Sequence, residues 1–174
     1  GARRRRWRPM LADILGVSSE TIGALESEYD RRLTAIQERF PGDLADVLVS
    51  IVILPNDTQA FHYARNSAFF EMSVLREVGV GLPDYSPPEA TLALEQLPQI
   101  DADVLLYYTR TASGTVTSNI PNLPVWQFLN VVKAGQAHDL GLRYGGPTYK
   151  LAFNILNSLE KVLFAPGFNA AVME

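Results

Sequence analysis

The stretch that decides the fold is LALEQLPQIDADVLLYYTR, residues 92–110. Its first part, 92–97, has apolar side chains at the spacing of a short helical turn. Pro98 is expected to end that turn, because the residue before a proline is pushed out of the α region. After a polar corner at 100–103, residues 104–108 form a continuous apolar run, which is typical of a strand buried on both faces of a parallel sheet.

This predicted strand ends where α/β proteins commonly bind their ligands. It stops at Thr109 and Arg110, and a polar loop containing Gly114 follows. In open α/β sheets, ligands bind beyond the carboxyl ends of the strands. Arg110 and its loop are therefore candidates for a binding site, although an arginine at this place is equally well explained as a surface residue.

Upstream, residues 18–41 predict one long helix. Ser18 is a suitable N-cap and Glu20 places an acid in the first turn. Apolar side chains then recur every three or four residues as far as Phe40, in one stripe along the helix, and Pro41 stops it. A helix of about 20 residues is about 30 Å long, enough to run along the side of a domain.

The other expected elements alternate between strands and helices. The clearest strand covers 47–54, which is apolar throughout and is therefore expected to be central. This alternation predicts an α/β fold, a three-layer α/β/α sandwich around a mainly parallel sheet. The remaining elements are a short strand at 61–65, a helix capped by Asn66 and Ser67 that ends at Gly79, a proline-rich loop at 81–90, a helix from 123 with an apolar face continued by Val131 and Val132, an edge strand after a turn at 134–137, and a helix at 148–164.

Composition and charge exclude several classes of function. The net charge is −4, but five of the fifteen basic residues are arginines within 3–8, so the rest of the chain is strongly acidic. An acidic body argues against a nucleic-acid-binding face. The arginine run itself fits either a contact with phosphate or anionic lipid or a solvated end. The chain has no cysteine, so disulfides, thiolate metal sites and cysteine nucleophiles are excluded.

Catalytic signatures are missing, and no catalytic residue or enzyme activity is predicted. The sequence contains no G-x-S-x-G elbow, P-loop, G-x-G-x-x-G or H-E-x-x-H motif. His62 and His138 are far apart and lack neighbours at metal-ligand spacing, so no metal site is predicted either. Asp101 and Asp103 are more typical of a capped turn before a strand than of a catalytic pair.

Two parts of the central stretch also resemble a known family. Leu94-Glu95-Gln96-Leu97, followed by Ile100-Asp101-Ala102-Asp103 and an apolar strand, is similar to the C-terminal lobe of iron-siderophore periplasmic-binding proteins. These are the substrate-binding components of ABC importers of the ferrichrome, ferric-enterobactin and vitamin B12 type. The order of the expected elements from Trp7 to about Phe164 is similar as well. The resemblance implies that 1–17 are a remnant of an N-terminal lobe or a linker, 18–41 an interlobe bridging helix, and 42–174 the C-terminal α/β lobe, Rossmann-like and of the class III type.

The function implied by this resemblance is uptake of an iron(III)-siderophore. The protein would capture the complex outside the cytoplasm, in the periplasm or anchored by lipid to the outer face of the cell membrane, and deliver it to an ABC permease. It would have no intrinsic cofactor. The chain begins with Gly1-Ala2 rather than methionine and lacks the family's N-terminal lobe, which indicates a fragment with half a site. We therefore expect weak binding by this chain alone, and a possible dimer through exposed lobe surface.

Six residues are candidate ligand contacts. A guanidinium offers five planar donors and a permanent charge, which suits an anionic ferric catecholate or carboxylate complex. Aromatic rings suit a bulky chelate, although each could instead belong to the core or an edge. The two arginines and four aromatic residues are Arg65, Arg110, Tyr63, Tyr108, Trp126 and Tyr144.

Glu71 has a different expected role. In the family, an exposed glutamate near the start of a helix docks on the membrane permease, and Glu71 lies at about that place. The alternative is a solvated residue close to the favourable N-terminal end of the helix dipole. Two other functions stay open: the same scaffold carrying haem or a corrinoid, and a flavodoxin-like regulatory or enzyme domain, for which 55–58 would be a weak phosphate loop.

Overall fold

The computed structural model describes six segments of the chain, which together contain every element discussed below. The predicted arginine run, the Asn66-Ser67 cap and the loop after Thr109 lie outside these segments. The described segments are 18–54, 59–62, 69–83, 91–109, 118–141 and 148–168.

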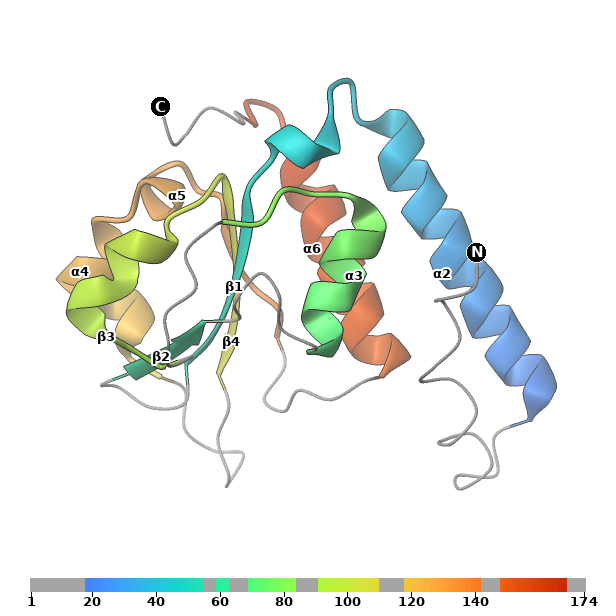
Figure 1. Cartoon of the computed structure of the whole chain (residues 1–174), viewed down its shortest axis with the longest axis horizontal. Helices are drawn as coiled ribbons and strands as arrows, with labels where there is room; N and C mark the ends of the chain where they lie inside the picture. Colours follow the sequence, from blue (N-terminus) through green and yellow to red (C-terminus); the bar gives the residue numbers. More distant parts are fainter. Residues whose placement is uncertain are drawn as a thin grey trace.

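A five-stranded sheet forms the centre, with the strand order β3-β2-β1-β4-β5 (Figure 1). β1, β4 and β5 are parallel, whereas β2 runs antiparallel to both of its neighbours. The sheet is thus mixed rather than mainly parallel, because only a few residues separate β1 from β2 and such a short connection joins antiparallel strands. The strands are β1 (Val49–Leu54), β2 (Gln59–His62), β3 (Thr91–Ala93), β4 (Val104–Thr109) and β5 (Ala137–Asp139).

β1 and β4 are the core of the sheet. They pair in register over six residues, from Val49 opposite Val104 to Leu54 opposite Thr109. Every residue of β1 is buried, as its apolar sequence predicts. Because side chains alternate along a strand, Ile51 faces the hydrophobic cluster on one side of the sheet and Val52 faces the cluster on the other side.

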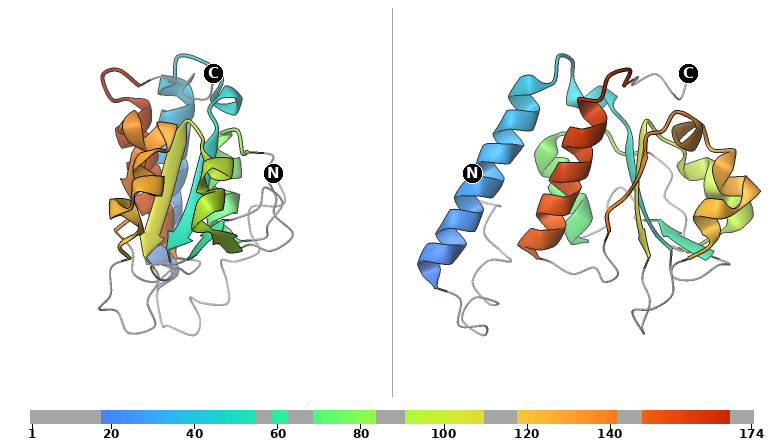
Figure 2. Two further views of the ribbon diagram at one scale, coloured as in Figure 1. Left: turned by 90° about the vertical axis from the view of Figure 1, so that its left-hand side faces the viewer. Right: turned by 180° about the vertical axis from the view of Figure 1, so that it is seen from behind.

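Helices cover both faces of the sheet, which confirms the predicted three-layer sandwich (Figures 1 and 2). One face carries α3 and α6, and α2 packs outside them. In the part of the chain that the structure describes, the other face carries only short helices, most of them a single turn. The bounds are α2 (Ser19–Arg39), η1 (Leu44–Asp46), α3 (Phe70–Val78), η2 (Leu94–Ile100), η3 (Ile120–Asn122), α4 (Pro124–Gln127), α5 (Asn130–Lys133) and α6 (Tyr149–Leu163).

The predicted long helix is confirmed as α2. Its N-cap is Ser18, whose side chain accepts a hydrogen bond from the backbone N–H of Thr21. The apolar stripe buries Leu33 and its helical neighbours against α3 and α6. At its edge, Arg32 forms a partly buried ion pair with Glu160 of α6, with Nη2 at 2.6 Å from Oε2. Apolar and polar contacts together fix α2 to the body of the lobe.

Two further hydrogen-bond sets tie α2 to α3. The hydroxyl of Tyr29 donates to Oε2 of Glu77 at 2.8 Å. The side-chain amide of Gln37 donates to the backbone carbonyls of Glu77 and Val78, at 3.0 and 3.2 Å. The second set satisfies carbonyl groups in the last turn of α3, which have no partner within the helix itself.

The two aspartates of the central stretch are structural, as expected. Asp101 accepts hydrogen bonds from the backbone N–H groups of Asn130 and Val131, at 2.7 and 3.1 Å. Oδ2 of Asp103 accepts from the backbone N–H of Leu48 at 2.8 Å. Asp101 therefore caps α5, and Asp103 fastens the start of β1 to the start of β4.

The start of the central stretch differs from the prediction. Leu92 lies in β3 rather than in a helical turn. The helical part is the 3-10 helix η2, which runs through Pro98 instead of ending before it. The first turn is held by a hydrogen bond from the backbone N–H of Ala93 to Oε1 of Gln96, so the missing N–H of the proline removes only one later bond.

The helix expected from residue 123 is also interrupted. Leu129 is extended (φ −60°, ψ 137°) and separates α4 from α5. The cause is Asp101, which caps the backbone of Asn130 and so starts a new helix there. Elsewhere, β2 starts two residues before the expected strand at 61–65, and the end of that range lies outside the described residues.

The N-cap of α3 is Phe69 rather than the expected Asn66 or Ser67, because residue 69 is still extended, and the other helix ends agree with the sequence. α3 ends at Gly79, whose φ of 93° is readily adopted by glycine. Thr148 caps α6, accepting a hydrogen bond from the backbone N–H of Leu151. Among the described residues, no helix has both the length and the apolar character to cross a membrane.

Replacing Asp101 with alanine should lower the free energy of unfolding by about 2 kcal/mol, because it leaves two backbone donors at the start of α5 without their charged acceptor. Urea unfolding followed by circular dichroism measures the change. The matched control is Asp43→Ala, which removes an exposed cap on Ala45 and should cost only about 0.5 kcal/mol. Equal losses in the two variants would contradict a special role for Asp101.

Candidate functional site

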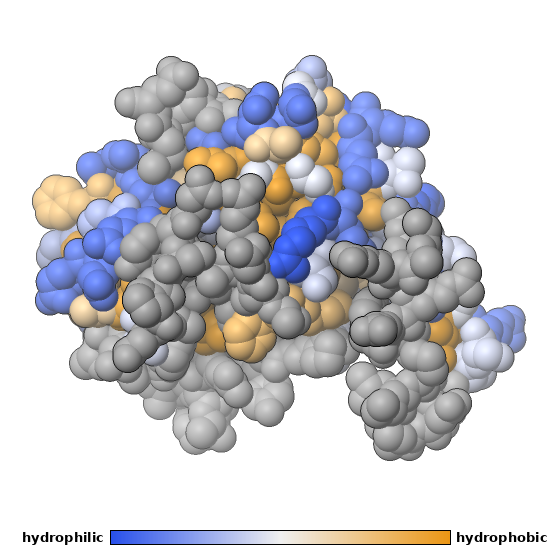
Figure 3. Space-filling view, viewed as in Figure 1, coloured by the Kyte–Doolittle hydropathy of each residue, from blue (hydrophilic) through white to orange (hydrophobic). Residues whose placement is uncertain are grey.

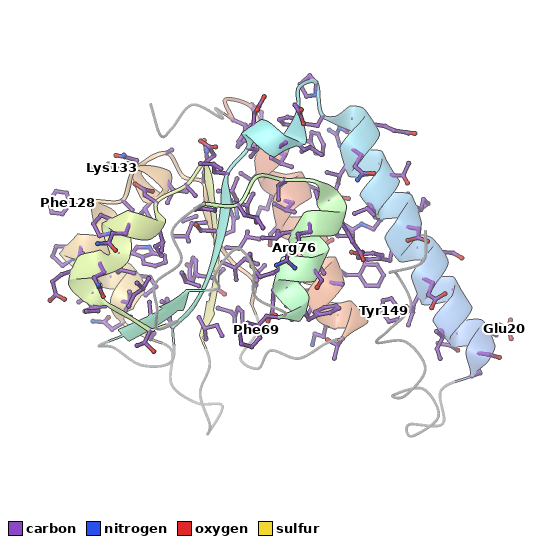
Figure 4. The ribbon with its side chains drawn as sticks, viewed as in Figure 1. Glu20, Phe69, Arg76, Phe128, Lys133 and Tyr149 are labelled. Carbon is purple, nitrogen blue, oxygen red and sulfur yellow. The ribbon has the colours of Figure 1, made fainter. Side chains whose placement is uncertain are left out.

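The carboxyl ends of β1 and β4 lie side by side, because Leu54 pairs with Thr109 at the end of the parallel register. The first turns of α3 and α6 point to the same side of the molecule, where Phe69 and Tyr149 lie (Figure 4). We call this side, defined by these four residues, the strand-end edge. It is the side on which α/β sheets bind ligands.

Tyr108 lies next to the strand-end edge, but its side chain points into the core. It is 1% exposed and belongs to the hydrophobic cluster under α3 and α6. Its hydroxyl donates a hydrogen bond to Oε1 of Glu71 at 2.8 Å. A direct contact between Tyr108 and a ligand therefore gains no support, and the core alternative describes its position.

Trp126 is also buried, at 2% exposure, and lies on the other face of the sheet. Its indole packs against the ring of Tyr107 edge to face, with centroids 5.0 Å apart and planes at 77°. Since neighbouring residues of a strand face opposite sides, Tyr107 turns toward Trp126 while Tyr108 turns away. The structure does not bring Trp126 and Tyr108 together.

Four of the predicted ligand contacts lie outside the described residues. These are Tyr63, Arg65, Arg110 and Tyr144. The described parts of the chain show only where their segments start: Arg110 directly follows β4, and Arg65 follows β2 by three residues. Their binding roles stay predictions.

Glu71 is not exposed, and the exposure that the docking prediction assumed is wrong. It is 4% exposed, in the first turn of α3, where the helix dipole favours a carboxylate. The bond from Tyr108 orients it toward β4. In this arrangement its carboxylate cannot meet the surface of a partner.

One residue at this edge was missed by the sequence reasoning. Phe69 is 53% exposed at the N-cap position of α3. The adjacent Phe70 is the first residue of the helix and packs against the core, whereas Phe69 precedes the helix. A helix that starts at residue 70 leaves the first of these two apolar residues outside its buried face.

Two hollows lie at the opposite end of the molecule, near the last turn of α6. The larger, of about 490 Å³, is lined by Phe40, Asp43 and Phe168 among others. The smaller, of about 270 Å³, includes His138 and Lys161 in its wall. Among the described residues, no group of three or more acidic or histidine side chains could hold a metal ion.

The chain has the fold of one lobe of a periplasmic binding protein, and two relatives define the class. It is 30% identical to the achromobactin-binding periplasmic protein of Dickeya dadantii over 131 residues, which make up 71% of this chain and 40% of that protein. The siderophore periplasmic binding protein from the fuscachelin gene cluster of Thermobifida fusca superposes with a TM-score of 0.67 at 25% identity, covering 88% of this chain and 56% of that one.

A third relative shows the same fold at greater distance. The triscatecholate siderophore binding protein FeuA of Bacillus subtilis, solved with ferri-bacillibactin, matches with a TM-score of 0.64 and 14% identity, covering 83% of this chain and 53% of that one. No protein-family model matches the chain. The chain spans about half the length of these relatives. The predicted resemblance to siderophore-binding periplasmic proteins is confirmed.

His138 gives the lobe a measurable pH dependence. Burial lowers the pKa of this half-buried imidazole below its usual 6.5, and the nearby charge of Lys161 lowers it further. Below about pH 6.5 the unfolded chain therefore binds a proton that the folded chain does not. Stability from the neutral imidazole is present above this pH and is lost as the pH falls.

We expect His138→Gln to flatten the decline in unfolding free energy between about pH 7.5 and 5.5. Urea unfolding of both proteins at several pH values measures the difference, in which the other titrating groups cancel. Parallel curves for the two proteins would show that His138 does not titrate differently on folding.

Proposed function

We propose that the chain is the C-terminal lobe of an extracytoplasmic receptor that captures a ferric siderophore and delivers it to an ABC permease. The observation that carries this proposal is the combination of 30% sequence identity to a siderophore-binding periplasmic protein with the shared lobe fold. The relatives are binding proteins, and the proposed role includes no chemistry on the ligand.

The proposed division of the chain treats α2 as a helix that bridges two lobes. We assign 18–41 to the bridging helix, 42–174 to the lobe, and 1–17 to a linker or part of a preceding lobe. The polar contacts of Arg32 and Tyr29 support treating the helix and the lobe as one body. The strand-end edge would then face the cleft between two lobes.

The proposed ligand contacts are the segments that follow the strand-end edge. Arg110 continues β4, and Arg65 precedes α3. Two guanidinium groups there would attract a ferric complex with net negative charge, and the rings of Tyr63 and Tyr144 would pack on it. Tyr108 and Trp126 are buried, so we assign them to the core and not to the ligand contacts.

The proposals on partners and location have unequal support. The names of the relatives support a periplasmic site of action, and lipid anchoring remains part of the proposal. A permease contact would use surface other than the buried Glu71. A dimer gains no support: the two large apolar side chains that are exposed among the described residues, Phe69 and Phe128, belong to opposite faces of the sheet (Figure 4).

On the face shown in Figure 3, hydrophobic side chains gather over α3 and the segment after it, framed by the hydrophilic side chains of α2. Phe128 is covered in part by Lys133, whose Nζ lies 5.4 Å from the centroid of the ring.

The proposal is tested by titrating ferric achromobactin, ferri-bacillibactin and ferrioxamine B into this chain and into a form extended by an N-terminal lobe. Tryptophan fluorescence reports binding. We expect saturable quenching with at least one complex in the extended form, and weak or no quenching with this chain alone, since half a cleft encloses too little of the ligand. Absence of quenching in both forms would reject siderophore binding.

The role of Arg110 is tested in the extended form. Arg110→Ala should weaken binding of ferri-bacillibactin, a negatively charged triscatecholate complex, by about tenfold or more, because a charge-assisted hydrogen bond is lost. Arg31→Ala is the control, since Arg31 is an exposed residue of α2 paired with Glu28. Equal affinities in the two variants would remove Arg110 from the site.

A further inference from the structure

We propose that Tyr108 and Glu71 are positioning residues, whose buried hydrogen bond sets the relative placement of the two segments that supply the ligand contacts. This inference rests on the proposed function. It concerns Tyr108, which the sequence suggested as a ligand contact, and Glu71, which the resemblance suggested as a permease contact, and it gives both of them a role inside the lobe instead.

The bond joins two elements at the strand-end edge. Tyr108 is the last residue but one of β4, and Glu71 is the second residue of α3. Their oxygen atoms are 2.8 Å apart, and both side chains are almost completely buried. The donor and the acceptor are therefore held by packing on all sides, so the bond fixes the end of the strand against the start of the helix.

The chain beyond each partner leads directly into a proposed ligand segment. Arg110 is two residues after Tyr108, and Arg65 is six residues before Glu71. The hydrogen bond between Tyr108 and Glu71 therefore fixes the end of β4 against the start of α3, the two segment roots at which the proposed ligand segments begin or end. Fixing these two points before the ligand arrives reduces the entropy that binding would otherwise cost, which raises affinity without any contact to the ligand.

The burial of Glu71 indicates that this link has a purpose beyond stability. Taking a carboxylate out of water is costly, and an apolar pair of the same size often stabilises a core as well or better. Here the buried carboxylate lies in the first turn of a helix, where the helix dipole lowers the cost of burying it, and it is bonded to the end of a strand next to the proposed site. An apolar pair in place of Tyr108 and Glu71 would not fix the strand end and the helix start in one specific position.

The lobe contains a matched control for this bond. The hydroxyl of Tyr29 donates to Oε2 of Glu77 at the same distance of 2.8 Å, and Tyr29 is buried in the same hydrophobic cluster. Glu77, however, is in the last turn of α3, at the end away from the strand-end edge. Both bonds hold α3, but only the bond of Tyr108 holds it beside the proposed ligand segments.

The test compares Tyr108→Phe with Tyr29→Phe in the form extended by an N-terminal lobe. Both variants lose one hydroxyl and should lower the melting temperature, Tyr108→Phe by more, because its bond is fully buried and that of Tyr29 only partly. Tyr108→Phe should raise the Kd for the ferric complex that the wild type binds by about tenfold, because binding must then hold the strand end and the helix start in place, whereas Tyr29→Phe should change it less than about twofold. Similar Kd values in the two variants would overturn the proposal.

Two further measurements decide the case if a variant or the ligand fails. Should Tyr108→Phe not fold, Glu71→Gln keeps an acceptor of the same shape but without charge, and an unchanged Kd in that variant would overturn the positioning role. Hydrogen exchange needs no ligand: Tyr108→Phe should speed exchange of backbone amides at both segment roots about tenfold or more, and Tyr29→Phe should not. A wild type that binds no ferric complex would reject the proposed function, whereas unchanged exchange at those roots would reject the link itself.

Discussion

The parallel pairing of β1 with β4 is the constraint on which the rest of the lobe depends. Both strands are largely apolar, so neither can lie at a solvated edge, and six consecutive residue pairs fix their register. This pairing forces a helical layer onto each face. It also brings the two strand ends to one side, where the chain leaves the sheet twice. Both the core and the place of the proposed site follow from this single pairing.

The elements that could be predicted from the sequence are those whose signals are local. The stripe of Leu33 and Ile36, the cap at Ser18 and the stop at Pro41 together define α2 without knowledge of any other segment. The break at Leu129 could not be predicted in this way. It is imposed by Asp101, which lies far away in the sequence and captures the backbone that a continuous helix would have used.

The candidate site was predictable in its location but not in its side chains. A strand that ends at Thr109 points to the ligand side of an α/β sheet whatever its neighbours are. The continuous apolar run before it shows no alternation, so it does not reveal that Tyr107 and Tyr108 face opposite layers. The burial of Glu71 was hidden for a similar reason, because a carboxylate inside a core becomes intelligible only once its tyrosine donor is located.

The attachment of α2 has a mechanical consequence. The helix is held at Tyr29, Arg32 and Gln37 along its second half, and the apolar stripe lies between these contacts. The helix, roughly 30 Å long, therefore forms one rigid body with the lobe. Any swing of this lobe against a neighbouring body would therefore carry α2 along with it.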